Sequence, residues 1–258
     1  MSNEVNLVEV MTVAASKEVK DYQRVFVGVG LPVLAAALAK KIHAPHALLC
    51  TEHGLIDFSP VRFPPLSVVD PGMIPGAAML TTMLECLGVT LQGGWIDVGF
   101  LGAAQIDKRG NLNSTVIGDY SAPKVRLVGS GGANDIASNA KEFIIIMRGH
   151  DRRKFVERVD YVTSPGYLDG PGSREKHGLK GGGPSAVISD LGIFRFDENK
   201  EMYLEFHHPG VSIERVKENT SWDLKISSNV KETPRPTKQE IEILHRIDPL
   251  GIYLKSKA

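Results

Sequence analysis

The chain has 258 residues, 42% of them hydrophobic, and its 30 Lys and Arg residues balance its 30 Asp and Glu residues. Such a chain can bury a sizeable core, which excludes a disordered protein. Zero net charge argues against a nucleic-acid binder, which needs basic side chains to neutralise phosphates. Because the sequence has no apolar run of membrane-spanning length, no signal pattern and only two cysteines without metal-ligand spacing, we expect a soluble cytoplasmic protein without a metal site.

Short apolar strands alternate with helices over the first 150 residues. Leu7–Val19 has apolar residues at helical spacing, and the β-branched run Arg24–Val29 is typical of a buried parallel strand. A helix over Val33–Ile42 and a strand over Ala47–Cys50 follow. Beyond these we expect a helix over Gly76–Leu87, a strand over Ile96–Ile106, a turn over Asp107–Gly110, a strand over Val125–Val128, a helix over Asn134–Ala140 and a strand over Phe143–Met147.

The rest of the chain is less regular. Gly166–Pro184 is a long glycine-rich segment, which indicates either a functional lid or a mobile surface loop. A hairpin of Ile193–Phe196 with Met202–Phe206 is expected, and Thr237–Glu240 is a capping box that opens a helix. The strand–glycine–helix–strand rhythm predicts an α/β protein with a parallel sheet. No linker divides the sequence, so we expect a single domain over residues 1–258.

Two glycine clusters follow predicted strands. Gly28 and Gly30 lie before a helix, but the dinucleotide-binding fingerprint needs a third glycine where Val33 stands. A tight strand–helix turn is therefore the better interpretation, with an anion-binding turn as the functional alternative. The denser cluster, 129–134, could present backbone N–H groups to an oxyanion or form a plain turn, and the residues alone leave both open.

Glu52 follows the predicted strand Ala47–Cys50, at the edge where open parallel sheets bind ligands. A carboxylate there is either a solvated loop residue or a catalytic group. For His53 we favour a packing or solvent-facing role over that of a base, and Cys50 is expected to be a buried, inert thiol. The sequence has no G-x-S-x-G nucleophile elbow, so a serine hydrolase has no support.

Seven segments in order carry a family resemblance. They are VGVGLP (27–32), EHGLIDFSP (52–60), GAAQID (102–107), GNLNST (110–115), IGDY (117–120), GSGGAN (129–134) and DYVTSPG (160–166). Together they closely resemble the β subunits of the glutaconate CoA-transferase family, within the family I CoA-transferases. The likeness runs from about residue 5 to about residue 255.

This resemblance implies an open three-layer α/β/α fold with a mainly parallel sheet. It also implies a separate α subunit, assembled with this one as an α2β2 tetramer, and a nucleophilic glutamate that maps onto Glu52. The family's glycine loop beside that nucleophile maps onto Gly131, Gly132, Ala133 and Asn134. His53 departs from the small or amide residue that is common after the glutamate in relatives, which leaves the acyl preference open.

The implied reaction moves CoA from an acyl thioester to a free carboxylic acid, either a dicarboxylic or a 3-oxo acid, through a glutamyl-CoA intermediate on Glu52. CoA is a substrate, and no cofactor is required. Gly131 and Gly132 are the candidate oxyanion donors. If water reached the intermediate, the same glutamate would make an acyl-CoA hydrolase of ring-derived CoA esters. A decarboxylase relative has cysteine at the nucleophile position, and Glu52 argues against that activity. A non-enzymatic scaffold subunit is the alternative from another class.

The charged segment Ser173–His177 has two interpretations. It could become ordered by binding the phosphates of CoA, or it could be a solvated turn. We favour the solvated turn.

Overall fold

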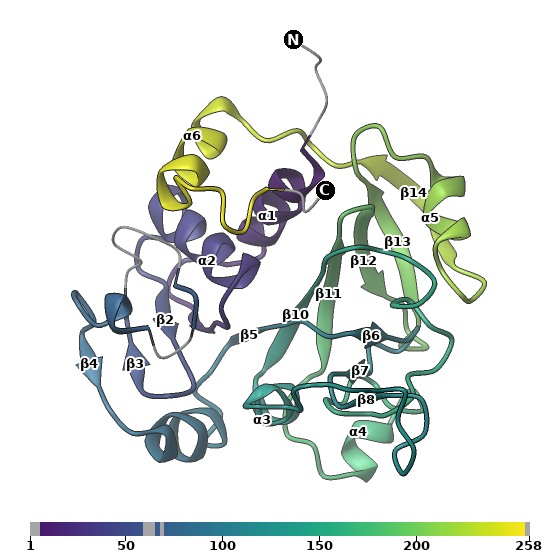
Figure 1. Ribbon diagram of the computed structural model, residues 1–258, viewed down its shortest axis with the longest axis horizontal. Helices are drawn as coiled ribbons and strands as arrows, with labels where there is room; N and C mark the ends of the chain where they lie inside the picture. The colour runs from purple at the N-terminus through teal and green to yellow at the C-terminus, as the bar shows by residue number, and fades with distance from the viewer. Residues whose placement is uncertain (1–5, 59–64, 68–69, 256–258) are drawn as a thin grey trace.

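The computed structural model describes residues 6–58, 65–67 and 70–255. Its centre is one ten-stranded sheet (Figure 1). In spatial order the strands are β14 (Lys225–Glu232), β13 (Met202–His207), β12 (Gly192–Phe196), β11 (Pro184–Ser189), β10 (Glu142–Met147), β5 (Val98–Leu101), β1 (Arg24–Phe26), β2 (Leu48–Cys50), β3 (Leu55–Ile56) and β4 (Met79–Leu80). From β11 to β2 all neighbours are parallel, whereas β12, β3 and β4 are added antiparallel.

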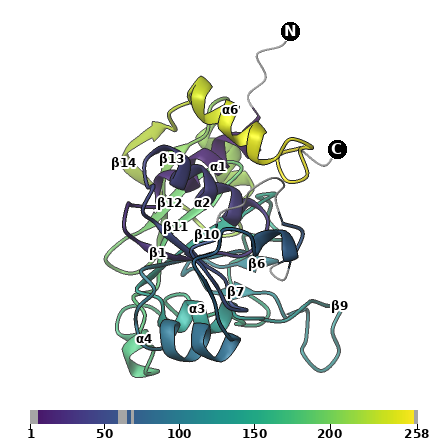
Figure 2. The same ribbon diagram turned by 90° about the vertical axis from the view of Figure 1, so that its left-hand side faces the viewer.

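Helices cover both faces of this sheet, which makes three layers (Figure 2). One face carries α1 (Leu7–Lys17), α2 (Leu31–Ile42) and α6 (Lys238–Ile247), and the other carries the π-helix η2 (Leu84–Leu91), α3 (Ala133–Asn139) and α5 (Ile213–Glu218). Alternate residues of a strand point to opposite faces, so Ile144 belongs to one core and Ile145 to the other. The expected α/β fold with a mainly parallel sheet is confirmed.

Local sequence signals explain several of these elements. Asn6 caps α1 by accepting from the N–H groups of Val8 and Glu9. The predicted capping box of α6 is confirmed, because Thr237 Oγ1 accepts from the Glu240 N–H at 3.2 Å and Glu240 Oε2 accepts from the Thr237 N–H at 2.6 Å. The expected hairpin is formed by β12 and β13.

The predicted helix over Gly76–Leu87 is wrong over its first half. Gly76 has φ +85°, which a helix does not accept, and Met79 and Leu80 form the edge strand β4 against β3. A short 3-10 turn, Pro71–Met73, precedes this strand. Apolar residues at 79, 80, 83, 84 and 87 suit a helix as well as a strand followed by a helix, and pairing with β3 decides between them.

Two predicted strands also differ from the structure. The run Ile96–Ile106 is broken after β5, and its end, β6 (Gln105–Ile106), pairs with β7 (Leu112–Asn113) outside the main sheet. The run Val125–Val128 contributes only β9 (Val125–Arg126), which pairs with β8 (Val116–Ile117) in a peripheral hairpin (Figure 2). Val128 is 99% exposed, so this apolar run does not belong to the buried parallel sheet.

The glycine-rich segment 166–184 is neither a lid nor a free loop in the structure. It contains a short helix, α4 (Ser173–Lys176), and the Arg174 side chain is buried. Its guanidinium donates four hydrogen bonds of 2.7–3.0 Å, to the carbonyl oxygens of Pro165, Gly166, Ala137 and Gly181. Arg174 therefore holds this segment against α3, and our favoured interpretation of a solvated turn is wrong for this residue.

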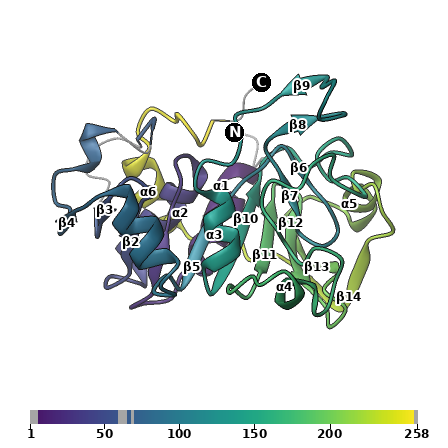
Figure 3. The ribbon, with the colours of Figure 1, turned by 90° about the horizontal axis from the view of Figure 1, so that it is seen from below.

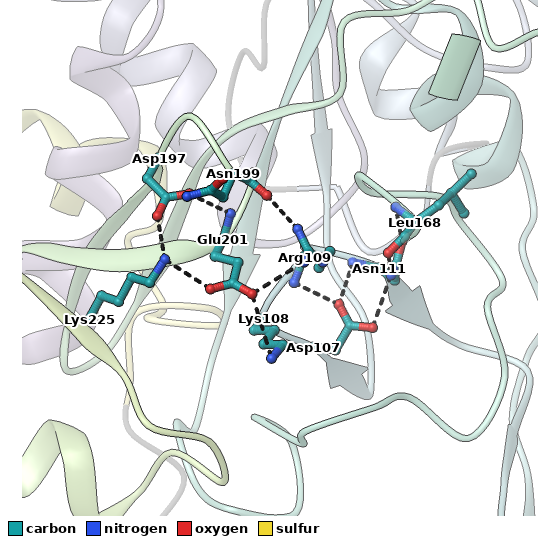
Figure 4. Close-up of polar contacts among 9 residues, drawn as sticks. All are labelled: Asp107, Lys108, Arg109, Asn111, Leu168, Asp197, Asn199, Glu201 and Lys225. Carbon is teal, nitrogen blue, oxygen red and sulfur yellow. Dashed lines mark hydrogen bonds and ion pairs between the residues drawn. The ribbon is translucent and has the colours of Figure 1, made fainter. Parts of the chain in front are cut away.

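A polar network holds the turn predicted over Asp107–Gly110 (Figure 4). The Asp107 carboxylate accepts from the N–H groups of Arg109 at 2.9 Å and Asn111 at 3.1 Å. The Arg109 guanidinium in turn contacts Glu201 on the loop between β12 and β13, and Lys225 of β14 also pairs with Glu201. This network ties two family-motif segments to the edge of the sheet, so their polar residues are explained by structure alone.

Candidate functional site

A cavity of about 530 Å³ lies at the carboxyl ends of four neighbouring parallel strands, β2, β1, β5 and β10. Each strand delivers residues to it as the chain leaves the sheet. These residues are Glu52 after β2, Gly28 and Val29 after β1, Gly102 and Ala103 after β5, and Arg148 after β10. The chain order reverses between β1 and β5, which is where open α/β sheets bind ligands.

Glu52 lies in the tight turn between β2 and β3. The Gly54 N–H donates to the Thr51 carbonyl at 3.3 Å, and the buried Thr51 hydroxyl accepts from the Leu55 N–H at 3.3 Å. The half-buried Glu52 side chain lines the cavity. Its Oε2 atom accepts a hydrogen bond from the Gly132 N–H at 2.8 Å. The turn therefore presents a carboxylate to the cavity with one oxygen held by a backbone donor.

The glycine loop approaches Glu52 from the opposite side of the cavity. Gly131 has φ +49°, and a Cβ atom added to Gly132 would lie 2.3 Å from Glu52 Oε2. Only glycine at 132 allows the backbone N–H and the carboxylate to meet at hydrogen-bond distance. Figure 3 shows this loop leading from the β8–β9 hairpin into α3, beside the parallel strands.

The other residues predicted for this loop divide into two groups. Ala133 lines the cavity together with Gly131 and Gly132. Asn134 does not line it: its side-chain amide donates to the Thr163 carbonyl at 2.7 Å. Asn134 thus holds the start of α3 against the segment 160–166, which is a structural role.

The first glycine turn also borders the cavity. Gly28 lines it, and a Cβ atom added there would meet no heavy atom within 4 Å. Gly30 is not among the lining residues; it begins α2 with φ +92°. Val33, which breaks the dinucleotide fingerprint, is buried in the core beneath this turn.

Two further residues of the cavity wall were not found by sequence reasoning. Tyr253 lies in the C-terminal turn, where nothing in the sequence pattern marks it. Arg148 is the first polar residue after β10, and its place at the carboxyl end of a predicted parallel strand could have identified it. The remaining wall is mainly apolar and includes Phe26, Leu31, Phe100, Ile136 and Ile146.

The neighbours of Glu52 supply no competing nucleophile or base. Burial raises the pKa of the Cys50 thiol to about 12, so this thiol stays protonated, as the predicted inert role requires. Burial also lowers the pKa of His53, whose Nδ1 atom is enclosed and has no hydrogen-bond partner among the described residues. Within the described ranges, no group of three or more His, Cys, Asp or Glu residues could hold a metal ion.

A second cavity, of about 660 Å³, is lined by both acidic and basic residues next to the network of Figure 4. Lys108 and Arg109 there are already paired with Glu201. In the part of the chain that the structure describes, no helix is long and apolar enough to cross a bilayer.

Comparison with known proteins identifies the class to which this arrangement belongs. The model of the coenzyme A transferase family matches residues 8–219, and the chain belongs to this family.

Two curated relatives are similar over almost their whole length. The chain is 44% identical over 241 residues to the B-type subunit of 3-oxoadipate CoA-transferase from Pseudomonas knackmussii, covering 93% of this chain and 92% of the relative. It is 43% identical over 254 residues to the B-type subunit of glutaconate CoA-transferase from Acidaminococcus fermentans, covering 96% and 94%. The crystal structure of glutaconate coenzyme A-transferase from Acidaminococcus fermentans matches with a TM-score of 0.91 at 41% identity, over 98% of each chain. The family and the fold that the sequence motifs predict are therefore confirmed.

Proposed function

We propose that this chain is the subunit of a heteromeric CoA-transferase that carries the nucleophile, Glu52, and that CoA passes through a covalent glutamyl-CoA thioester on this residue. The observation that carries the proposal is the Glu52 carboxylate in a cavity at the strand ends, with one oxygen bound by the Gly132 N–H at 2.8 Å. Family membership supports CoA transfer as the overall reaction.

The hydrogen bond assigns different roles to the two carboxylate oxygens. Oε1 has no donor among the described residues, so it is the oxygen free to attack the thioester carbonyl of an acyl-CoA. The carbon–sulfur bond breaks, the CoA thiolate leaves, and a mixed anhydride joins the acyl group to Glu52. The thiolate then attacks the glutamyl carbon and releases the acyl group as a carboxylate, which leaves glutamyl-CoA.

Gly132 acts in the steps at the glutamyl carbon. When the thiolate adds to this carbon, negative charge develops on Oε2, which already accepts from the Gly132 N–H. Such a preorganised donor is worth about 3–4 kcal/mol in the transition state. The acceptor acid reverses the sequence: its carboxylate displaces the thiolate from glutamyl-CoA, and the thiolate attacks the new acyl carbonyl. Every step balances without a cofactor, and CoA is a substrate.

The acid substrate that we propose is dicarboxylic. Glutaconate and 3-oxoadipate, the acids in the names of the two relatives, both carry two carboxylates on chains of different length. Both relatives are named as one lettered component of an enzyme with more than one kind of chain, which supports a separate α subunit as the partner. We propose an α2β2 assembly in the cytoplasm, with residues 1–258 of this chain as one domain.

Glu52→Gln tests the proposal directly. An amide cannot form the anhydride, so we expect loss of CoA exchange in a complex that still assembles. Incubation of the wild-type complex with acyl-CoA and no acceptor acid should leave CoA bonded to the peptide that contains Glu52, detected by mass spectrometry. Full exchange activity in the Gln variant would refute the role of Glu52. Rapid release of free CoA without an adduct would instead identify a hydrolase.

A further inference from the structure

Charge is scarce in the cavity around Glu52. Among the described residues that line it, the charged side chains are Glu52 and Arg148, and most of the others are apolar or glycine. The half-buried Arg148 extends from the carboxyl end of β10, and Glu52 follows β2 across the same cavity. A cation in a mainly apolar cavity is costly without an anionic partner, so the cavity itself indicates an anionic ligand group opposite the nucleophile.

The Arg148 guanidinium is oriented but not saturated. It donates to the main-chain carbonyls of Tyr253 at 3.0 Å and Lys255 at 2.5 Å, and within the described residues it forms no ion pair with a carboxylate. Arginine has five N–H donors, so three remain for a ligand. The two carbonyl contacts fix the plane of the guanidinium, and a fixed plane favours two-point binding of a carboxylate.

The main chain around Arg148 is also held in place. Its carbonyl accepts from Lys154 Nζ at 2.6 Å, and the N–H groups of Gly149 and His150 both donate to Asp190 Oδ1, at 2.9 and 2.8 Å. A binding group mounted on such a fixed turn loses little conformational freedom when a ligand arrives. This rigidity is expected of a group that determines specificity.

We propose that Arg148 binds the distal carboxylate of a dicarboxylic acid whose other carboxylate exchanges CoA at Glu52; this rests on the function proposed above. The phosphates of CoA are the other anionic source, but the pantetheine arm separates them from the thioester. The thioester must lie against Glu52, so the cation that shares its cavity faces the acyl chain. Arg148 therefore determines the choice between dicarboxylic and monocarboxylic substrates.

Matched acceptor acids test this assignment in the complex of the chain with its partner subunit. The donor is acetyl-CoA, whose acyl group has no distal charge, and the acceptors are glutarate and pentanoate, which have five carbons each. We expect Arg148→Met to lower kcat/KM for glutarate about 30-fold or more, because a desolvated charge pair loses one partner. The value for pentanoate and the KM for acetyl-CoA should stay within about threefold. Arg148→Lys should retain part of the preference for glutarate.

Charge reversal keeps the test decisive if Arg148→Met weakens the C-terminal turn. In Arg148→Glu, 4-aminobutyrate, which carries a distal ammonium, should become a better acceptor than glutarate. Arg153→Met is the matched control, because the Arg153 side chain is 91% exposed and pairs only with Asp151 beside it among the described residues.

The outcomes separate the two proposals. An equal loss for glutarate and pentanoate, a loss only in the KM for acetyl-CoA, or no reversal in Arg148→Glu would overturn the role of Arg148 while the transferase stands. Exchange activity that survives Glu52→Gln would overturn the proposed function itself.

Discussion

Gly132→Ala offers a sharp test of how the glycine loop serves Glu52. The added Cβ would lie 2.3 Å from Glu52 Oε2 and 3.4 Å from both Glu52 Cβ and Cδ. Ordinary contact begins near 3.4 Å, so the carboxylate oxygen must retreat by about 1 Å, and its 2.8 Å hydrogen bond is lost or stretched. A misplacement of about 1 Å costs on the order of 100-fold in rate, and loss of one oxyanion donor costs about 100- to 1000-fold.

These two estimates describe the same displacement, so we do not multiply them. We expect kcat for CoA exchange to fall about 100- to 1000-fold, with KM for the acyl-CoA changed only a few-fold. The fold should persist, because Gly132 has φ −80° and ψ 0°, which alanine accepts. The covalent adduct should form more slowly in rapid-quench mass spectrometry.

Gly88→Ala is the matched control. It adds the same methyl group at an ordinary 3.5 Å contact with Leu84 in η2, away from the cavity. Both variants should melt within a few degrees of the wild type. If Gly132→Ala kept kcat within about threefold of the wild type, neither the close approach nor the N–H donor would matter to the rate, and the assignment of Gly132 would fail.

Two further predictions concern stability. Burial lowers the pKa of His150 to about 3 and that of His208 to about 4, from 6.5; the folded state holds both rings neutral, so stability is full above pH 6.5 and falls as acid protonates the unfolded chain. Each ring should cost about 2 kcal/mol by pH 5, measured by urea unfolding between pH 7 and 5; a constant free energy of unfolding there would contradict the assignment, and His208→Gln should flatten the slope. Arg174→Met leaves four buried carbonyl contacts without their donor and should lower the free energy of unfolding by about 3–5 kcal/mol. An unchanged urea midpoint in that variant would show that the segment 166–184 is not held by this side chain.

Sequence patterns predict the structure correctly where a few neighbouring residues decide it. The Thr237–Glu240 capping box, the β12–β13 hairpin and the strand β10 depend on contacts a few residues apart or on a continuous apolar run. They fail where a distant partner decides. Pairing with β3 made Met79 and Leu80 a strand, and the buried carbonyls around Arg174 turned a charged segment into an anchor.

The candidate site divides in the same way. Glu52 and Gly132 could each be named from the sequence, because motif order and residue type mark a nucleophile and a loop that tolerates close approach. Their hydrogen bond joins positions 80 residues apart, and it exists because β2 and α3 are both placed by the same sheet. Arg148 could not be recognised as a ligand group, because its importance depends on the lack of other cations among the described residues around one cavity.

The order of apolar runs, turns and motifs therefore determined the α/β class, the family and the identity of the carboxylate. Only the folded sheet decided which strand ends meet at one cavity, which glycine N–H faces Glu52 and which cation lies opposite it. The physical reason is that hydrogen-bond capping and hydrophobic periodicity act over a few residues, whereas a binding cavity is made by packing between segments that are far apart in the chain.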